Sequence, residues 1–144
     1  MARIAVDAMG GDFAPEPIVA GAVSAAESQP SIEKLFLVGQ TAAVEAALAA
    51  QPSVPPTVEV VEAAEVVAMD EAPVVAVRRK RDSSISRAVD LVRKGRADAI
   101  FSAGNTGAAV AATTLKLRTL EGVGRPAIAT IAVSYTHLRA HETE

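Results

Sequence analysis

The 144-residue chain is half apolar, only 3% aromatic, and carries a formal net charge of −3. This charge excludes the broad basic surface of a general nucleic-acid binder, and the absence of cysteine excludes disulfides, thiolate metal sites and a cysteine nucleophile. The apolar stretch at the start is too short for a signal peptide, and no run approaches the ~18 apolar residues of a membrane span. We therefore expect a cytoplasmic protein with no nucleic-acid partner.

Short apolar runs alternate with helical patterns along the chain. Strands are predicted over residues 3–9, 34–39, 57–63, 97–103 and 126–133, and helices over about 15–27, 41–50, 82–95 and 106–118. Residues 64–81 fit either a loop or a short helix after Asp70. Alternating strands and helices predict an α/β fold of three layers, a mostly parallel sheet with flanking helices.

The helix predicted over 82–95 has the clearest local signals. Ser83 or Ser84 can cap its start, and Gly95 supplies a left-handed stop at its end. Asp90 and Lys94 are spaced as an i,i+4 ion pair on the solvent side. Further upstream, Asp12 is a candidate cap for the helix that starts near residue 15.

The last residues look foreign to the rest. Residues 133–143, VSYTHLRAHET, hold both histidines and the only tyrosine, and they resemble the translated frame of a sequencing-library adapter. We expect a natural segment over 1–132, the N-terminal part of a longer protein, and a non-native tail over 133–144. His137 and His141 have the spacing of helix-borne zinc ligands, but no Glu follows His137, so no metal site is predicted.

The segment SAGNTG follows a predicted strand and opens a predicted helix. Glycines at 104 and 107 allow an anion to approach the main chain, while Ser102, Asn105 and Thr106 add polar side chains. The first turn of the helix offers unpaired N–H groups and a partial positive charge. The segment is a candidate phosphate or oxyanion site, or else a tight turn with a capping residue.

A second turn, DAMGGDF, follows the first strand and contributes Asp7, Gly10, Gly11 and Asp12. These carboxylates can orient a donor, bind a metal or cap the next helix, although two ligands are too few to predict a magnesium site. A third stretch, RRKRDSS at 78–84, places cations before a helix start with two serines. It is a solvated charge run, a phosphate-neutralising group, or a surface for an acidic protein partner.

Taken together, RIAVDAMGGDFAPEPIVAGA, KRDSSISRAVDLVRKGRADAIFSAGNTGA and LEGVGRPAIAT resemble the PlsX-type phosphate acyltransferases. The resemblance covers residues 3 to about 132 and implies a fold similar to isocitrate and isopropylmalate dehydrogenases, here truncated. It implies transfer of a fatty acyl group from acyl carrier protein to inorganic phosphate, giving acyl phosphate for phospholipid synthesis, with no metal or organic cofactor. It also implies a homodimer at full length, with any peripheral membrane association made by later residues.

The resemblance assigns roles to residues of the three stretches. We expect catalytic roles for Asn105, Asp12 and Lys80. Phosphate or oxyanion contacts are expected from Gly10, Gly11, Ser83, Ser84, Ser102, Gly104, Thr106 and Gly107. Docking of the acidic carrier protein is expected at Arg78, Arg79 and Arg81. The alternatives are an acetyltransferase that uses coenzyme A thioesters, a non-catalytic phosphate-binding module, and a truncated chain that folds poorly.

Overall fold

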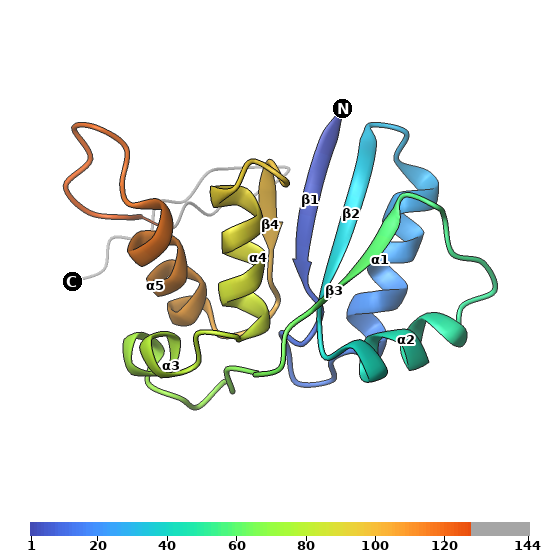
Figure 1. The fold of residues 1–144 in the computed structure, drawn as a ribbon, viewed down its shortest axis with the longest axis horizontal. Helices are drawn as coiled ribbons and strands as arrows, with labels where there is room; N and C mark the ends of the chain where they lie inside the picture. Colours follow the sequence, from blue (N-terminus) through green and yellow to red (C-terminus); the bar gives the residue numbers. More distant parts are fainter. Residues whose placement is uncertain (128–144) are drawn as a thin grey trace, which may run out of the picture.

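The computed structural model describes residues 1–127, which form alternating strands and helices (Figure 1). The elements in chain order are β1 (Ala2–Asp7), α1 (Glu16–Ser28), β2 (Ile32–Gly39), α2 (Thr41–Ala49), β3 (Val58–Glu62), α3 (Pro73–Arg79), α4 (Ser84–Arg93), β4 (Ala99–Phe101) and α5 (Thr106–Leu117). The elements predicted within these residues are confirmed. Residues 73–79 form a short helix, which is one of the two alternatives that the sequence allowed for residues 64–81. Residues 128–133 of the last predicted strand, and the tail with His137 and His141, lie outside the described residues.

The strands form a four-stranded parallel sheet in the order β3-β2-β1-β4. The chain builds outward from β1 through β2 to β3, then crosses back to β4 on the other side of β1. Helices α1 and α2 pack on one face of the sheet, and α4 packs on the opposite face with α5 and α3 outside it (Figure 1). The predicted α/β class and parallel sheet are confirmed, and the likeness to the dehydrogenases stays a prediction.

The two faces of the sheet follow from the alternation of side chains along each strand. On β2, Leu35 and Leu37 pack toward α1 and α2, whereas Phe36 and Val38 pack toward α4. On β1, Val6 belongs to the first cluster and Ala5 to the second. A strand buried on both faces is apolar at successive positions, which is why β1 and β2 read as continuous apolar runs.

Helix α4 lies between the sheet and α5, so it is buried on two sides. Its contact with α5 changes one predicted ion pair: Asp90 accepts from Lys116 of α5 at 2.7 Å and lies 3.2 Å from Arg93. The predicted Asp90–Lys94 pair is therefore wrong, because tertiary packing brings a closer cation. Gly95 has the predicted left-handed conformation, with φ of +68°.

Two predicted caps differ from the structure. Ser83 is the N-cap residue of α4, yet its side chain makes no capping hydrogen bond. Asp12 does not cap α1, because α1 begins after Pro15 and Asp12 is exposed in the preceding loop. Proline suits this position because a first-turn N–H has no partner within the helix. Both segments reach helical geometry without the side-chain oxygen that usually satisfies a first-turn amide.

None of the helices within residues 1–127 is both long and apolar enough to cross a bilayer.

Candidate functional site

The loops that follow β1 and β4 meet at the carboxyl edge of the sheet. These two strands are direct neighbours, yet the helices that follow them, α1 and α5, lie on opposite faces. Open parallel sheets bind ligands beyond the carboxyl ends of the strands at such a reversal. The sequence predicts DAMGGDF and SAGNTG as two separate candidate sites. The fold brings both segments together at this edge of the sheet.

A hydrogen bond joins the two loops. The Ser102 hydroxyl donates to Oδ2 of Asp7 at 2.7 Å, and the Ser102 oxygen accepts from the N–H of Gly104 at 3.2 Å. The pair follows from the strand register, since Val6 lies opposite Phe101 and the next residues are Asp7 and Ser102. Asp7 is only 4% exposed, and its Oδ1 has no hydrogen-bond partner among the described residues.

Two glycines let the loops approach this closely. A Cβ on Gly10 would lie 2.7 Å from Asp7 Oδ2, 2.9 Å from the Gly104 nitrogen and 2.9 Å from Ser102 Oγ. A Cβ on Gly104 would lie 2.9 Å from the Cα of Gly10. Neither position has room for a side chain, so the two loops are in contact there through bare main chain.

Asn105 is the N-cap of α5 and also holds a distant loop. Its Oδ1 accepts from the N–H of Ala108 at 3.0 Å, and its Nδ2 lies 3.1–3.3 Å from the carbonyl oxygens of Ala68, Met69 and Glu71. Both polar atoms of the side chain are therefore bonded within the chain. This arrangement gives Asn105 a structural part in shaping the site, and its predicted contact with phosphate stays a prediction.

The first amides of α5 remain available. Within residues 1–127, no hydrogen bond is made by the N–H groups of Thr106 and Gly107, whereas that of Ala108 is capped. Thr106 is exposed and Gly107 is half-buried against Pro73, whose Cγ would lie 2.6 Å from a Cβ at position 107. The start of α5 can accept an anion, because its free N–H groups point out of the helix.

The half-buried Lys80 is bonded to the loop that precedes α3. Its ammonium group donates to the carbonyl oxygen of Val66 at 2.7 Å and forms an ion pair with Glu71. Hydrogen bonds from Lys80 and from the N–H of Ala68 lower the pKa of Glu71. In this structure Lys80 stabilises the segment between β3 and α3, and its predicted role toward phosphate needs these bonds to open.

Ser83 and Ser84 are buried at the start of α4. Residue 83 forms a parallel bridge with Glu65, and the N–H of Ser84 donates to the Glu65 carbonyl at 3.1 Å. The two serines are 0% and 2% exposed. Their predicted contact with phosphate stays a prediction.

Two further residues of the first loop are the half-buried Gly11 and the exposed Asp12. Gly11 has φ of +122°, a conformation that glycine adopts without strain. Asp12 is exposed, and no hydrogen bond of its side chain occurs among the described residues. Both belong to the loop that follows β1, and their predicted roles stay predictions.

The cations at 78–81 divide between two surface hollows. Arg78 and Arg81 line one hollow together with Arg93 and Lys116, so α3, α4 and α5 all contribute positive charge there. Arg79 lines another with Lys80, Glu65 and Glu71. The predicted docking surface is therefore split, and the first hollow has the larger share of cations.

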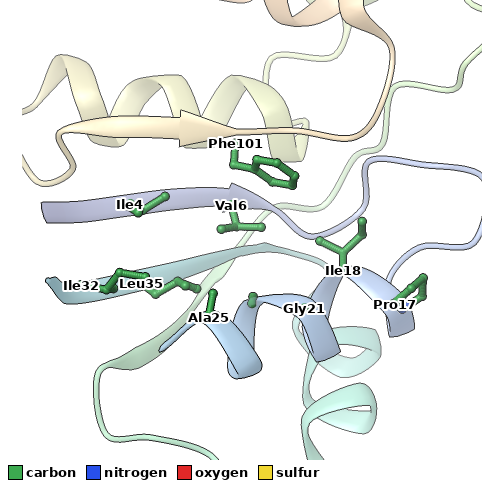
Figure 2. Close-up of a pocket in the computed structure, with 10 residues that line it drawn as sticks. Ile4, Val6, Pro17, Ile18, Gly21, Ala25, Ile32, Leu35 and Phe101 are labelled. Atoms are coloured by element: carbon green, nitrogen blue, oxygen red, sulfur yellow. The ribbon is translucent and has the colours of Figure 1, made fainter. Parts of the chain in front are cut away.

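An apolar groove of about 360 Å³ runs beside α1 on the face of the sheet opposite α4 (Figure 2). Its walls are apolar throughout and include Ile4 and Val6 of β1, Leu35 of β2, Phe101 of β4, and Ile18 and Gly21 of α1. Phe101 is 54% exposed because no side chain of residues 1–127 covers that end of β4. No sequence motif predicts this groove, although the register of β1 and β4 places these apolar side chains on one face.

The Asp7–Ser102 bond is the feature of the site that sequence reasoning missed. The sequence places Asp7 and Ser102 in two separate candidate turns and does not predict that they are in contact. The signal that could have paired them is the adjacency of the first and fourth strands, which the alternation of elements alone does not reveal. Among residues 1–127, no cluster of three or more His, Asp or Glu side chains could hold a metal ion.

Comparison with known proteins places this sequence in a family. The model of the family described as "Fatty acid synthesis protein" matches residues 2–136, which takes in the first four residues of the predicted tail. Proteins named phosphate acyltransferase are similar: that of Akkermansia muciniphila is 53% identical over 128 residues, and those of a Nostoc species and Desulfitobacterium hafniense are 54% identical over 129 and 131 residues.

These matches cover 89–91% of this chain but only 37–38% of each relative. The chain thus spans little more than a third of the length of the curated relatives it matches. The family model nevertheless covers far more than half of the chain, and the chain belongs to the fatty acid synthesis protein family, whose similar members are named phosphate acyltransferases.

Proposed function

We propose that this segment forms the phosphate-binding part of an enzyme that transfers a fatty acyl group from acyl carrier protein to inorganic phosphate. The product is an acyl phosphate. The names of the family and of its similar members support the reaction class. The meeting of the loops after β1 and β4 at the carboxyl edge of the sheet supports the placement of phosphate.

The observation that carries the proposal is the start of α5 beside the two joined loops. The N–H groups of Thr106 and Gly107 are free within residues 1–127, and Gly104 and Gly10 leave the main chain bare next to them. Phosphate held there would accept hydrogen bonds from amides that need no side-chain rearrangement. The helix dipole favours a negative charge at the same place.

The proposed reaction is a single nucleophilic displacement at the thioester carbon. An oxygen of hydrogen phosphate attacks the thioester carbonyl carbon, a carbon–oxygen bond forms, and the carbon–sulfur bond breaks. The proton of hydrogen phosphate goes to the departing sulfur, which leaves as the thiol of the carrier protein. The site mainly has to hold the two reactants together and stabilise the oxyanion.

The cationic hollow lined by Arg78, Arg81, Arg93 and Lys116 is the surface that we assign to the acidic carrier protein. Arg78 and Arg81 are exposed and form no ion pair among residues 1–127. Lys116 and Arg93 share Asp90 as their partner, so the hollow keeps a net positive charge. Complementary charge would speed the encounter of the two proteins and make it sensitive to salt.

A full-length hybrid provides the test. In this hybrid, the matching residues of the present chain replace the corresponding segment of the Akkermansia muciniphila relative. Thr106→Pro removes one first-turn N–H, and proline is well tolerated at the first position of a helix. We expect the KM for phosphate to rise about tenfold or more, since a hydrogen bond to a charged group is lost.

Thr106→Ala is the matched control, because it removes the hydroxyl and keeps the N–H. Acyl phosphate is trapped with hydroxylamine and counted against released thiol. Equal KM values for phosphate in the proline and alanine variants would contradict the placement of phosphate at α5. A folded hybrid that binds phosphate but forms no acyl phosphate, or that prefers coenzyme A thioesters to acyl carrier protein, would contradict the proposed reaction.

A further inference from the structure

We propose that the apolar groove beside α1 is the docking surface for a helix from the part of the longer relatives that lies outside the matched segment. The groove is lined by apolar side chains of β1, β2, β4 and α1 and has a volume of about 360 Å³. The matched segment covers only 37–38% of each relative, so most of the relatives' length remains to provide a cover. The occupant is therefore protein, and it belongs to the same polypeptide.

The sheet is covered unevenly on its two faces. Parallel sheets are normally covered by helices on both faces, and α4 packs on β1, β2 and β4 from one side. On the other side, α1 and α2 pack mainly on β2 and β3. Phe101 of β4 is consequently 54% exposed, and Ile4 of β1 is only half-buried. Every helix within residues 1–127 already packs elsewhere, so the cover for this face comes from outside these residues.

Small residues on α1 suit a helix as the occupant. Gly21 and Ala25 lie one turn apart on α1, and both line the groove opposite Phe101 and Ile4 (Figure 2). No atom lies within 4 Å of a Cβ built on Gly21, although glycine inside a helix is less favourable than alanine. The distance between the axes of two packed helices depends on the side chains at their contact. A further helix can therefore lie close against α1 at this point.

Two other occupants are a fatty acyl tail and a second copy of the chain. The tail is disfavoured because, in the described part of the chain, no residue of the loops after β1 and β4 lines the groove. Side-chain alternation also turns Asp7 and Ser102 to the face opposite Val6 and Phe101. A second copy would lose translational and rotational freedom on binding, a cost that a helix of the same polypeptide does not carry.

Hydroxyl-radical footprinting of the full-length hybrid tests the proposal, because oxidation of an aromatic side chain reports its exposure to solvent. Phe101 should lose most of its reactivity in the hybrid, relative to a peptide of residues 97–105 and to the separate 144-residue chain. Oxidation of Phe101 to the same extent in the hybrid as in the chain would overturn the proposal. Protection that appears only when palmitate is added, or that disappears as the hybrid dissociates into monomers on dilution, would overturn it too.

A substitution gives a second measurement. Phe101→Asp should lower the melting temperature of the hybrid by about 5 °C or more, because it places a charge beneath the covering helix, and should affect the 144-residue chain much less. Val54→Asp is the matched control, since it adds the same charge at a 42% exposed apolar side chain outside the groove. Equal losses from Phe101→Asp in the hybrid and the chain, or equal tolerance of both substitutions in the hybrid, would overturn the proposal. Footprinting of the unsubstituted hybrid decides the case in which Phe101→Asp does not fold.

Discussion

Asp7 and Ser102 are 95 positions apart in the chain, and their side chains are joined by a hydrogen bond of 2.7 Å. The bond extends the β1–β4 ladder by one residue, through side chains in place of main chain. Because Ser102 also accepts from the N–H of Gly104, one hydroxyl fixes the first loop, the second loop and the turn that leads into α5. The shape of the proposed phosphate site therefore depends on this contact.

Ser102→Ala should destabilise the chain by about 1–3 kcal/mol, because it leaves the buried Asp7 carboxylate without its donor. Urea unfolding of the 144-residue chain measures this. Asp7→Ala should cost a similar amount, and the double variant should cost clearly less than the sum of the two, as expected for partners in contact. Ser31→Ala, at an exposed serine, should change stability by no more than about 0.5 kcal/mol.

Gly10→Ala should destabilise the chain by about 1–3 kcal/mol, since its Cβ would meet Asp7, Ser102 and the main chain of Gly104 below 3.0 Å. The added methyl group also separates the two loops, so the KM for phosphate of the hybrid should rise. Gly21→Ala is the matched control. Its Cβ meets no atom within 4 Å, and alanine should stabilise α1 by about 0.5–1 kcal/mol. Similar unfolding curves for the two variants would argue against close packing at Gly10.

Two substitutions at Asn105 separate its two structural bonds. Asn105→Ala removes the cap of α5 and the tie to residues 68–71, and should cost at least the ~0.5–2 kcal/mol of a lost cap. Asn105→Asp keeps an acceptor for the N–H of Ala108 but turns a carboxylate oxygen toward three carbonyl oxygens. We expect it to retain most of the stability of α5 while exposing residues 68–71 to faster amide hydrogen exchange. Equal exchange in all three proteins would show that the tie contributes nothing.

The elements of this fold could be predicted from sequence because each is a local pattern. β1 and β2 are apolar runs, α5 begins after a capping Asn105, and Gly95 ends α4 in the left-handed conformation. The boundaries of these elements differ from expectation by a few residues at most. Local propensity and hydrophobic pattern were sufficient here because each element also packs in the way that its own sequence favours.

The site could be predicted only in its parts. Glycines and polar residues after two strands marked both loops, but which strands are neighbours depends on the crossover from β3 to β4. The burial of side chains could not be predicted from the sequence either. Ser83 and Ser84 have the sequence pattern of caps or anion ligands, yet both are buried because α4 is covered by the sheet and by α5. In the sequence, Lys80 belongs to a run of cations with no evident partner. In the structure it forms an ion pair with Glu71, nine residues away.

The pair between Asp98 and Arg3 ties the start of β1 to the residue before β4, and it should make stability depend on acid pH. Hydrogen bonds from the Arg3 side chain, and then from its N–H, lower the pKa of Asp98 from 3.8 to about 2. Because the folded-state pKa lies below the unfolded value, the stabilisation is present above pH 3.8 and is lost as the pH falls toward about 2. Asp98→Asn should therefore be less stable than the parent at neutral pH, and urea unfolding should show the two converging across that range. Arg3→Met should give the same profile, and a difference from the parent that stays constant with pH would contradict the linkage.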